Sequence, residues 1–404
     1  MAFQVGNIAG AETDGIQVFS SVSGTPVTVS TQRRHASEFS YELSGADTVT
    51  LPLWVSPATD QGTGRIVQFH MRTGVISPAG DVIEIRDADG GTLNARLRIV
   101  NDGGNDRFSW EDAAVTSTNG SLNLADNTWY LIEIFFEDTG TNDDVTVRVN
   151  GTNDIVITNA DNQASAVSSH ITFEKGWSST SVYFDNIVTG TGASSISDAL
   201  GDIEVLGYQT HDNTGAGPDL GDNVDDGSSN NWDNIAERPF SSTAWIAYNV
   251  VGAEGAIFTD SGARLGPTSD ARPTGGSTWY PNAVKAYYTR RRSGGQGRTH
   301  WNLVGNSSAT TITTDLWHFE VTLGTSFAIF QHVLDTSGGP TLDPPLITQS
   351  FALGFSKDFA SGQDTDCGDM LAEGIWQLNA PTATGNLSDV DMGQQHSFQG
   401  PFEV

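Results

Sequence analysis

The chain has 404 residues, of which 49 are acidic and 19 are basic, so its formal net charge at pH 7 is −30. So acidic a surface repels phosphates and disfavours a nucleic-acid-binding function. The 45 Gly and 10 Trp favour a folded, turn-rich protein of two or three domains, and the single cysteine, Cys367, excludes an internal disulfide framework.

The N-terminal sequence, MAFQVGNIAGAETDG, has neither the basic region nor the apolar run of a secretory signal peptide. No stretch of the chain approaches the length of apolar residues that a membrane-spanning helix needs. We therefore expect neither export by a signal peptide nor membrane insertion.

Short runs that alternate polar and apolar residues predict strands along the first half of the chain. Turn sequences between them, such as Asp89-Gly90-Gly91 and Asn150-Gly151, are typical of tight hairpins. The pattern therefore predicts antiparallel sheets. The expected strands are 27–30, 40–43, 48–55, 65–71, 82–85, 94–100, 129–136, 145–149, 155–158, 170–174 and 182–188.

A segment of small residues, 189–197 (TGTGASSIS), follows and predicts a linker. A short helix capped by Ser197 is expected next, and then an acidic, Gly- and Asn-rich loop at 209–234 and an irregular tail from 379. Further strands are expected at 201–208, 244–251, 284–289, 299–304, 316–323, 327–332, 349–355 and 374–378.

These elements predict an all-β fold of two antiparallel β-sandwich (jelly-roll) domains joined by a short Gly/Ser/Thr linker. The expected limits are 1–190 for the first domain and 198–404 for the second, which would contain the acidic loop and the irregular tail.

Three segments of the first half resemble a known family. They are WYLIEI at 129–134, VTVRVNG at 145–151 and VYFDNIV at 182–188, which are similar to the central strand, the following hairpin and the closing strand of the concanavalin A-like lectin/glucanase jelly roll in its laminin-G-like form. The resemblance covers residues 10–190 and implies a lectin-like sandwich.

The succession of this jelly roll and a second β domain, with VKAYY at 284–288 before a basic turn, resembles tail, fibre or capsid-associated structural proteins of tailed bacteriophages. The resemblance implies a non-enzymatic virion protein on the particle exterior, made in the host cytoplasm, for host-surface attachment or particle decoration. It also implies other virion subunits as partners, a homo-oligomer with a trimer favoured, and a host surface polysaccharide as ligand.

The sequence lacks the E-x-D-x-x-E pattern of the glucanases and the G-x-S-x-G elbow of serine hydrolases, which argues against catalysis. Two alternatives stay open. One is a polysaccharide depolymerase, either glycoside hydrolase or lyase, with its carboxylates on different strands. The other is a cellular adhesin domain.

Three tryptophans outside the clearest strands are candidates for stacking on sugar rings: Trp110, Trp177 and Trp232. Packing in the core is the alternative for each of them. Four arginines around the turn at 293–297 are candidates for contact with an acidic ligand or a neighbouring subunit: Arg290, Arg291, Arg292 and Arg298. A solvated turn is the alternative.

No cofactor is expected, with calcium kept as a hypothesis. Carboxylate oxygens suit Ca²⁺, and the laminin-G-like resemblance implies a calcium at one rim of the sandwich. The candidate ligands lie in the acidic loop, for which a solvated surface is the alternative: Asp219, Asp222, Asp225 and Asp226.

Overall fold

The computed structural model describes most of the first half of the chain and parts of the second: residues 4–11, 14–32, 39–55, 60, 62–77, 79–209, 223–224, 245–248, 252–259, 283–292, 300–308, 311–335, 350–357 and 365–377. In these ranges the paired strands run antiparallel, and the helical content is the short 3-10 helix η1 (Ile196–Asp198). The all-β class predicted from the sequence is therefore confirmed. No helix in the described part is long and apolar enough to cross a membrane.

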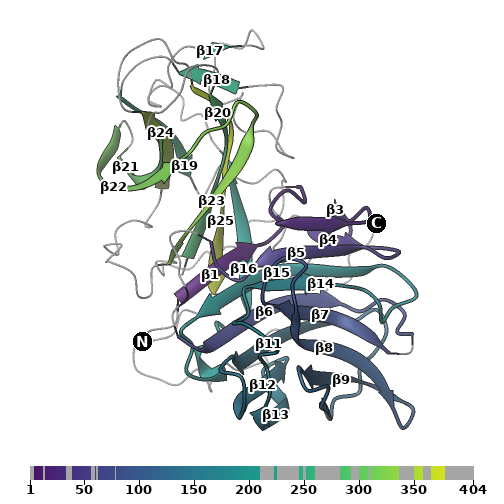
Figure 1. Cartoon of the computed structure of the whole chain (residues 1–404). Coiled ribbons are helices and arrows are strands. Elements are labelled where there is room, and N and C mark those ends of the chain that lie inside the picture. The colour runs from purple at the N-terminus through teal and green to yellow at the C-terminus, as the bar shows by residue number, and fades with distance from the viewer. Residues whose placement is uncertain are drawn as a thin grey trace, which may run out of the picture.

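Two sheets form the first sandwich (Figure 1). Sheet I has the order β13-β12-β11-β6-β15-β4-β3, with β1 paired to β15. Its strands are β1 (Gln4–Ala9), β3 (Val27–Val29), β4 (Ser40–Leu43), β6 (Gly64–Arg72), β11 (Trp129–Glu137), β12 (Asp143–Val149), β13 (Thr152–Ala160) and β15 (Val182–Thr191).

Sheet II has the order β10-β9-β8-β7-β14-β5-β2. Its strands are β2 (Ser21–Ser23), β5 (Thr48–Pro52), β7 (Gly80–Arg86), β8 (Leu93–Asp102), β9 (Asn105–Asp112), β10 (Ser117–Asn119) and β14 (His170–Phe173).

The core of the first sandwich lies between these two sheets. Because side chains alternate along a strand, the apolar residues of each strand meet in the interior. The ring of Phe173 from sheet II packs against Phe69 and Phe184 from sheet I, with centroid distances of 5.2 and 5.0 Å. The polar residues between them point to the outer faces, where any site must be sought.

The second half of the chain forms two further sheets. Sheet III has the order β17-β18-β25-β20-β23, with β16 paired to β25, and sheet IV has the order β19-β24-β21-β22. Their strands are β16 (Ile203–Gln209), β17 (Asn223–Val224), β18 (Trp245–Tyr248), β19 (Gly252–Thr259), β20 (Ala283–Arg292), β21 (His300–Ser308), β22 (Thr311–Val321), β23 (Ala328–Asp335), β24 (Ser350–Lys357) and β25 (Thr365–Gln377).

The predicted linker begins inside a strand. β15 continues to Thr191 because its end pairs with β1, a strand that the sequence pattern misses. The helix that follows is capped by Ser195, whose hydroxyl accepts from Ser197 N, and not by Ser197 as expected. The limits predicted for the two domains remain a prediction.

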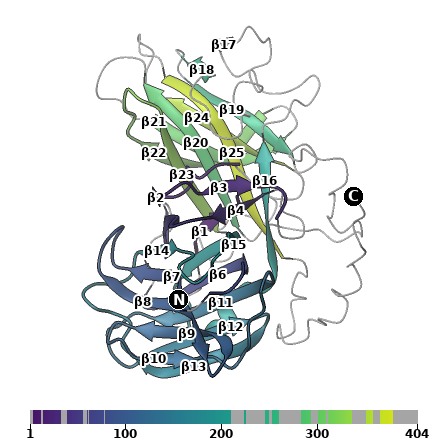
Figure 2. The ribbon, with the colours of Figure 1, turned by 90° about the vertical axis from the view of Figure 1, so that its right-hand side faces the viewer.

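Strand β1 lies at the junction of the two halves (Figures 1 and 2). Lys285 of β20 is fully buried there, and its Nζ donates to Asn7 Oδ1 and to the carbonyl of Ile8, both at 2.7 Å. Burial lowers the pKa of Lys285 to about 7, and the neighbouring charge of Glu373 opposes that shift.

Glu373 of β25 stands directly opposite Lys285 in the register of sheet III and is also fully buried. Its carboxylate accepts from Gly10 N at 3.3 Å and from the hydroxyl of Tyr287. Lys285, Tyr287 and Glu373, which we call the β1 clamp, therefore hold one strand of the first sandwich by its backbone and by Asn7.

The substitution Lys285→Met tests the clamp. It removes both bonds to β1 and leaves Glu373 buried without its cation, so we expect the free energy of unfolding to fall by about 3–5 kcal/mol. Urea unfolding of the full chain measures this loss. The double substitution K285M/E373Q should recover part of the loss, and a single-variant cost below about 1 kcal/mol would contradict the assignment.

Candidate functional site

The structure buries two of the predicted sugar-binding tryptophans. Trp110 and Trp177 have no exposed surface, so neither can stack on a sugar, and the prediction is wrong for both. Trp110 lies on β9 and points inward like Phe108, and its Nε1 donates to Asn162 Oδ1 at 3.2 Å. Core packing, the alternative from the sequence, is therefore the role of both side chains. Trp232 lies outside the described residues.

The predicted arginine cluster is not an exposed turn. Arg290, Arg291 and Arg292 are the last three residues of β20, and Arg290 is fully buried, so it cannot reach an external ligand. The Arg291 guanidinium lies 4.4 Å from the ring centroid of Phe327. Arg298 lies outside the described residues.

The predicted calcium ligands Asp219, Asp222, Asp225 and Asp226 also lie outside the described residues. Within the described ranges, no group of three His, Cys, Asp or Glu side chains is arranged to hold a metal ion. Calcium therefore remains a hypothesis from the sequence.

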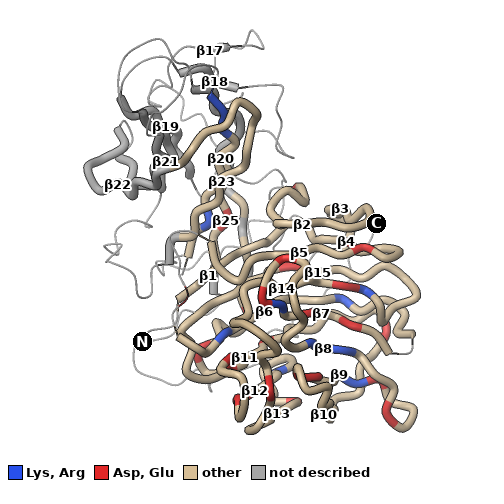
Figure 3. Tube along the Cα trace, viewed as in Figure 1, with Lys and Arg blue, Asp and Glu red and all other residues tan. Residues whose placement is uncertain are grey.

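The outer face of sheet II carries a network of paired charges on β7, β8 and β9 (Figure 3). Arg96 and Arg98 each form ion pairs with Asp81 and Glu111, at distances that include 3.1 Å for Arg96–Asp81 and 2.9 Å for Arg98–Glu111. Beside them Arg86 is paired with Glu84. These arginines are already neutralised by carboxylates of the same sheet.

Glu174 lies at the edge of this network. Burial raises its pKa to about 7, and the nearby carboxylates Glu84 and Asp81 add to the shift. Glu174 is therefore about half protonated near neutral pH.

This shift predicts a pH dependence of stability. With a folded pKa near 7 and an ordinary value of 4.5, Glu174 contributes stability in full below pH 4.5, and that contribution is lost as the pH rises through about 7. We expect Glu174→Gln to remove this downward slope. Unfolding measured across this pH range tests it, with Glu137→Gln as control, and an unchanged slope in the Glu174 variant would refute it.

The outer face of sheet I is covered at one end by residues 193–205, here called the covering segment. Gln68 of β6 binds this segment through both ends of its amide, since Nε2 donates to the carbonyl of Gly201 and Oε1 accepts from Leu200 N. His70 Nε2 lies 3.1 Å from Asp202 Oδ1, and His70 is 1% exposed. This end of the face is therefore closed.

The other end of the same face, which we call the open end, is half-buried and is not covered by this segment. Four half-buried side chains stand in one row across neighbouring strands: Glu42 of β4, Tyr183 of β15, Arg72 of β6 and Trp129 of β11. Each is directly opposite the next in the register. Their neighbours along the strands, such as Leu43, Phe184 and Met71, belong to the core, so the row points outward. At a strand spacing of about 4.8 Å the row spans about 14 Å.

Arg72 is unlike the other described arginines of the first sandwich. Its recorded contact is with the ring of Tyr183, 5.7 Å from guanidinium carbon to ring centroid, and within the described ranges it forms no ion pair. The other six are each paired with a carboxylate: Arg65, Arg86, Arg96, Arg98, Arg107 and Arg148. In a chain of charge −30, an arginine without a carboxylate partner is suited to an anionic ligand.

Tyr183 lies between a cation and a carboxylate. Burial and the charge of Glu42 raise its pKa, while Arg72 and the side chain of Ser181 act in the opposite direction. The phenol is therefore protonated at neutral pH and able to donate a proton. The row combines an acid, a cation, a carboxylate and two aromatic rings, and we take it as the candidate site.

The sequence contained a partial signal for this row. Tyr183 falls in the quoted closing strand, and Trp129 begins the quoted central strand. That Arg72 and Glu42 stand beside them depends on the register of four strands distant in sequence, which no local motif records.

No protein-family model matches the chain, and no curated protein matches it in sequence. Among solved structures it is similar to the endo-β-1,4-glucuronan lyase of the fungus Trichoderma reesei, at 10% identity and a TM-score of 0.34 over 48% of this chain and 96% of that one. Domain 4 of an extracellular arabinanase from Geobacillus stearothermophilus, in complex with arabinotriose, gives 14% identity and a TM-score of 0.35 over 49% and 97%. An alginate lyase in complex with an alginate trisaccharide gives 12% and 0.31 over 46% and 97%.

These comparisons correct the prediction that the chain is not an enzyme, because two of the three structures are polysaccharide lyases. The absence of the E-x-D-x-x-E pattern argues only against glucanase-type hydrolysis, in which the catalytic carboxylates lie on one strand. A site assembled from several strands, as in the row of Glu42, Tyr183, Arg72 and Trp129, escapes such a test.

Proposed function

We propose that the protein binds acidic polysaccharides at the open end of sheet I and cleaves them by β-elimination. The observation that carries the proposal is Arg72, a half-exposed guanidinium that lacks a carboxylate partner in the described part of the chain and stands between Tyr183 and Trp129. A uronate carboxylate matches the guanidinium fork, and the faces of sugar rings match the aromatic side chains.

The chemistry requires three functions that the row supplies. Arg72 pairs with the uronate carboxylate and so acidifies the C5 hydrogen of the sugar. The Glu42 carboxylate is the base that takes the C5 proton. Tyr183 donates its phenolic proton to the O4 atom of the leaving sugar as the C4–O4 bond breaks. The released chain has a new reducing end, whose C1 hydroxyl is the former O4 with the proton from Tyr183. The other chain ends in a uronate with a C4–C5 double bond, formed by the electron pair of the broken C5–H bond, and Glu42 keeps the C5 proton until solvent returns both residues to their starting states.

The row favours elimination over hydrolysis. Glycoside hydrolysis needs two carboxyl groups about 5–9.5 Å apart across the bond. Glu42 is the single carboxylate of the row.

The substitution Arg72→Lys tests binding. Lysine keeps the charge but loses the bidentate fork, so we expect affinity for a polyuronate to fall at least about tenfold. Affinity electrophoresis in gels containing polyglucuronate or alginate measures the change. Arg107→Lys is the matched control, since Arg107 is a similarly exposed arginine on sheet II. Equal retardation of both variants and the parent chain would count against the site.

The substitution Tyr183→Phe separates cleavage from binding. It removes the proton donor and retains the ring, so we expect kcat to fall about 10²–10⁴-fold with little change in KM. The measurement is the ultraviolet absorbance of the unsaturated product. A variant with unchanged kcat would show that Tyr183 is not the acid.

The virion exterior, the host cytoplasm as place of synthesis, the homotrimer and the other virion subunits remain predictions from the sequence resemblance. Cleavage of a host surface polysaccharide is compatible with each of them.

A further inference from the structure

The stereochemistry of cleavage depends on where the base and the acid of the row stand. Glu42 of β4 and Tyr183 of β15 are directly opposite each other in the register, and both point from the outer face of sheet I. Directly opposite residues of antiparallel strands have their Cβ atoms about 4.5–5.5 Å apart. The carboxylate and the phenol therefore stand side by side.

A sugar ring does not fit between these two side chains. Atoms in contact are about 3.5–4.0 Å apart, so two groups on opposite faces of a ring are separated by about 7 Å or more. On its other side Tyr183 is flanked by Arg72, whose guanidinium carbon lies 5.7 Å from the centroid of the Tyr183 ring. The base and the acid therefore reach the substrate from the same side, which is that of sheet I.

Arg72 determines which carbon atom lies above this pair. A carboxylate bound to the guanidinium places C5 of the sugar about 5 Å from the nearest guanidinium nitrogen, since the path is one hydrogen bond, one C–O bond and one C–C bond. That length matches the strand spacing of about 4.8 Å between Arg72 and Tyr183. C5 and its neighbour C4 therefore lie above Tyr183, with Glu42 on the next strand.

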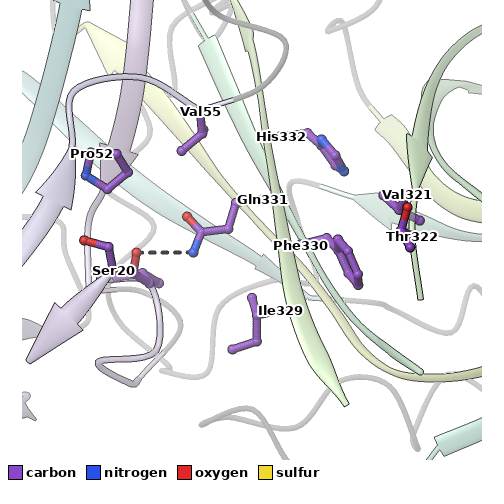
Figure 4. A pocket seen from close by; sticks show the side chains of 10 residues that line it. Ser20, Pro52, Val55, Val321, Thr322, Ile329, Phe330, Gln331 and His332 are labelled. Carbon is purple, nitrogen blue, oxygen red and sulfur yellow. Dashed lines mark hydrogen bonds between the residues drawn. The ribbon is translucent and has the colours of Figure 1, made fainter. Parts of the chain in front are cut away.

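A pocket of about 510 Å³ at the junction of the two halves is not suited to the same substrate (Figure 4). Its walls, which include Val18 and Pro52 of the first sandwich and Phe330 of β23, carry no Lys or Arg among the described residues. Gln331 donates its amide hydrogen to the carbonyl of Val18. A uronate carboxylate would lose hydration in this pocket without gaining a cation, so we expect the acidic chain at Arg72.

Uronates fall into two classes at the bond that breaks. In the gluco and manno configurations, H5 and O4 lie on the same side of the C4–C5 bond, and in the galacto and gulo configurations they lie on opposite sides. A base and an acid that act from one side can reach both groups of the first class in one orientation of the ring. In the second class, one of the two groups faces away from the sheet.

We propose that the row carries out syn elimination and therefore prefers polyuronates of the gluco or manno configuration. This inference rests on the proposed function. Glu42 takes H5, the electron pair of the C5–H bond forms the C4–C5 double bond, and the C4–O4 bond breaks as O4 takes the proton of Tyr183. Solvent then returns both residues to their starting states. Both classes carry the carboxylate that Arg72 binds, so the preference lies in kcat.

Initial rates of the full chain on four polymers of matched length test the inference: polyglucuronate, polymannuronate, polygalacturonate and polyguluronate. The signal is the ultraviolet absorbance of the unsaturated product. We expect kcat on the first two polymers to exceed kcat on the last two at least about tenfold, with similar KM, because misplacement of a reacting group by about 1 Å costs up to about 10²-fold.

The substitution Glu42→Gln tests the base in the same assay. It removes the proton acceptor and retains the shape of the side chain, so kcat on polymannuronate should fall about 10²–10⁴-fold with little change in KM. Glu137→Gln is the matched control, since Glu137 lies at the end of β11 away from Trp129 and the row. It should leave kcat unchanged.

The outcomes separate this inference from the proposed function. Unsaturated product formed at an equal or higher rate from polygalacturonate and polyguluronate would overturn the syn geometry and leave elimination standing. An unchanged kcat in Glu42→Gln would overturn the inference as well, because the base would then lie elsewhere. Absence of unsaturated product from all four polymers would overturn the proposed function, and the inference with it.

Discussion

The buried hydrogen bonds of Lys285 and Glu373 to strand β1 join the two halves of the molecule. Sheet III docks on the first sandwich through this contact, and β1 in turn pairs with β15, the strand that presents Tyr183. Buried charges of this kind are stable only when each finds its partners, so the clamp specifies one arrangement of the two halves.

On both outer faces of the first sandwich, the outward side chains alternate with core residues along each strand. The two faces nevertheless differ in how their charged side chains are paired. On sheet II, arginines and carboxylates stand opposite one another and neutralise the face. On sheet I, the covering segment closes the end at Gln68 and His70, and the row that includes Arg72 and Tyr183 stays open. In the part of the chain that the structure describes, sheet II therefore has a face of arginines paired with carboxylates, and sheet I has a candidate binding face with Arg72, which has no carboxylate partner there.

Sequence patterns predicted most strands of the first sandwich because alternation is a local property. The pattern missed β9, whose inward Phe108 and Trp110 follow the turn at Gly103, and Trp110 was therefore placed at the surface. The same limit hid the candidate site: Arg72 and Glu42 look like ordinary strand residues until the register brings them to Tyr183. Core residues can be predicted from the alternation of polar and apolar residues within one strand. A site on a sheet face depends on pairings between strands that are distant in the sequence.

Cleavage of acidic polysaccharides by elimination is the activity that we propose for this chain. The most direct test is incubation of the purified full chain with polyglucuronate, alginate and pectate, and with cellulose oligomers as the neutral comparison, followed by mass spectrometry of the products. The account predicts fragments of the acidic chains with an unsaturated terminal sugar, lighter by one water than hydrolysis products, and no cleavage of the neutral chain. Saturated fragments, or intact acidic chains under conditions where the protein binds them, would contradict it.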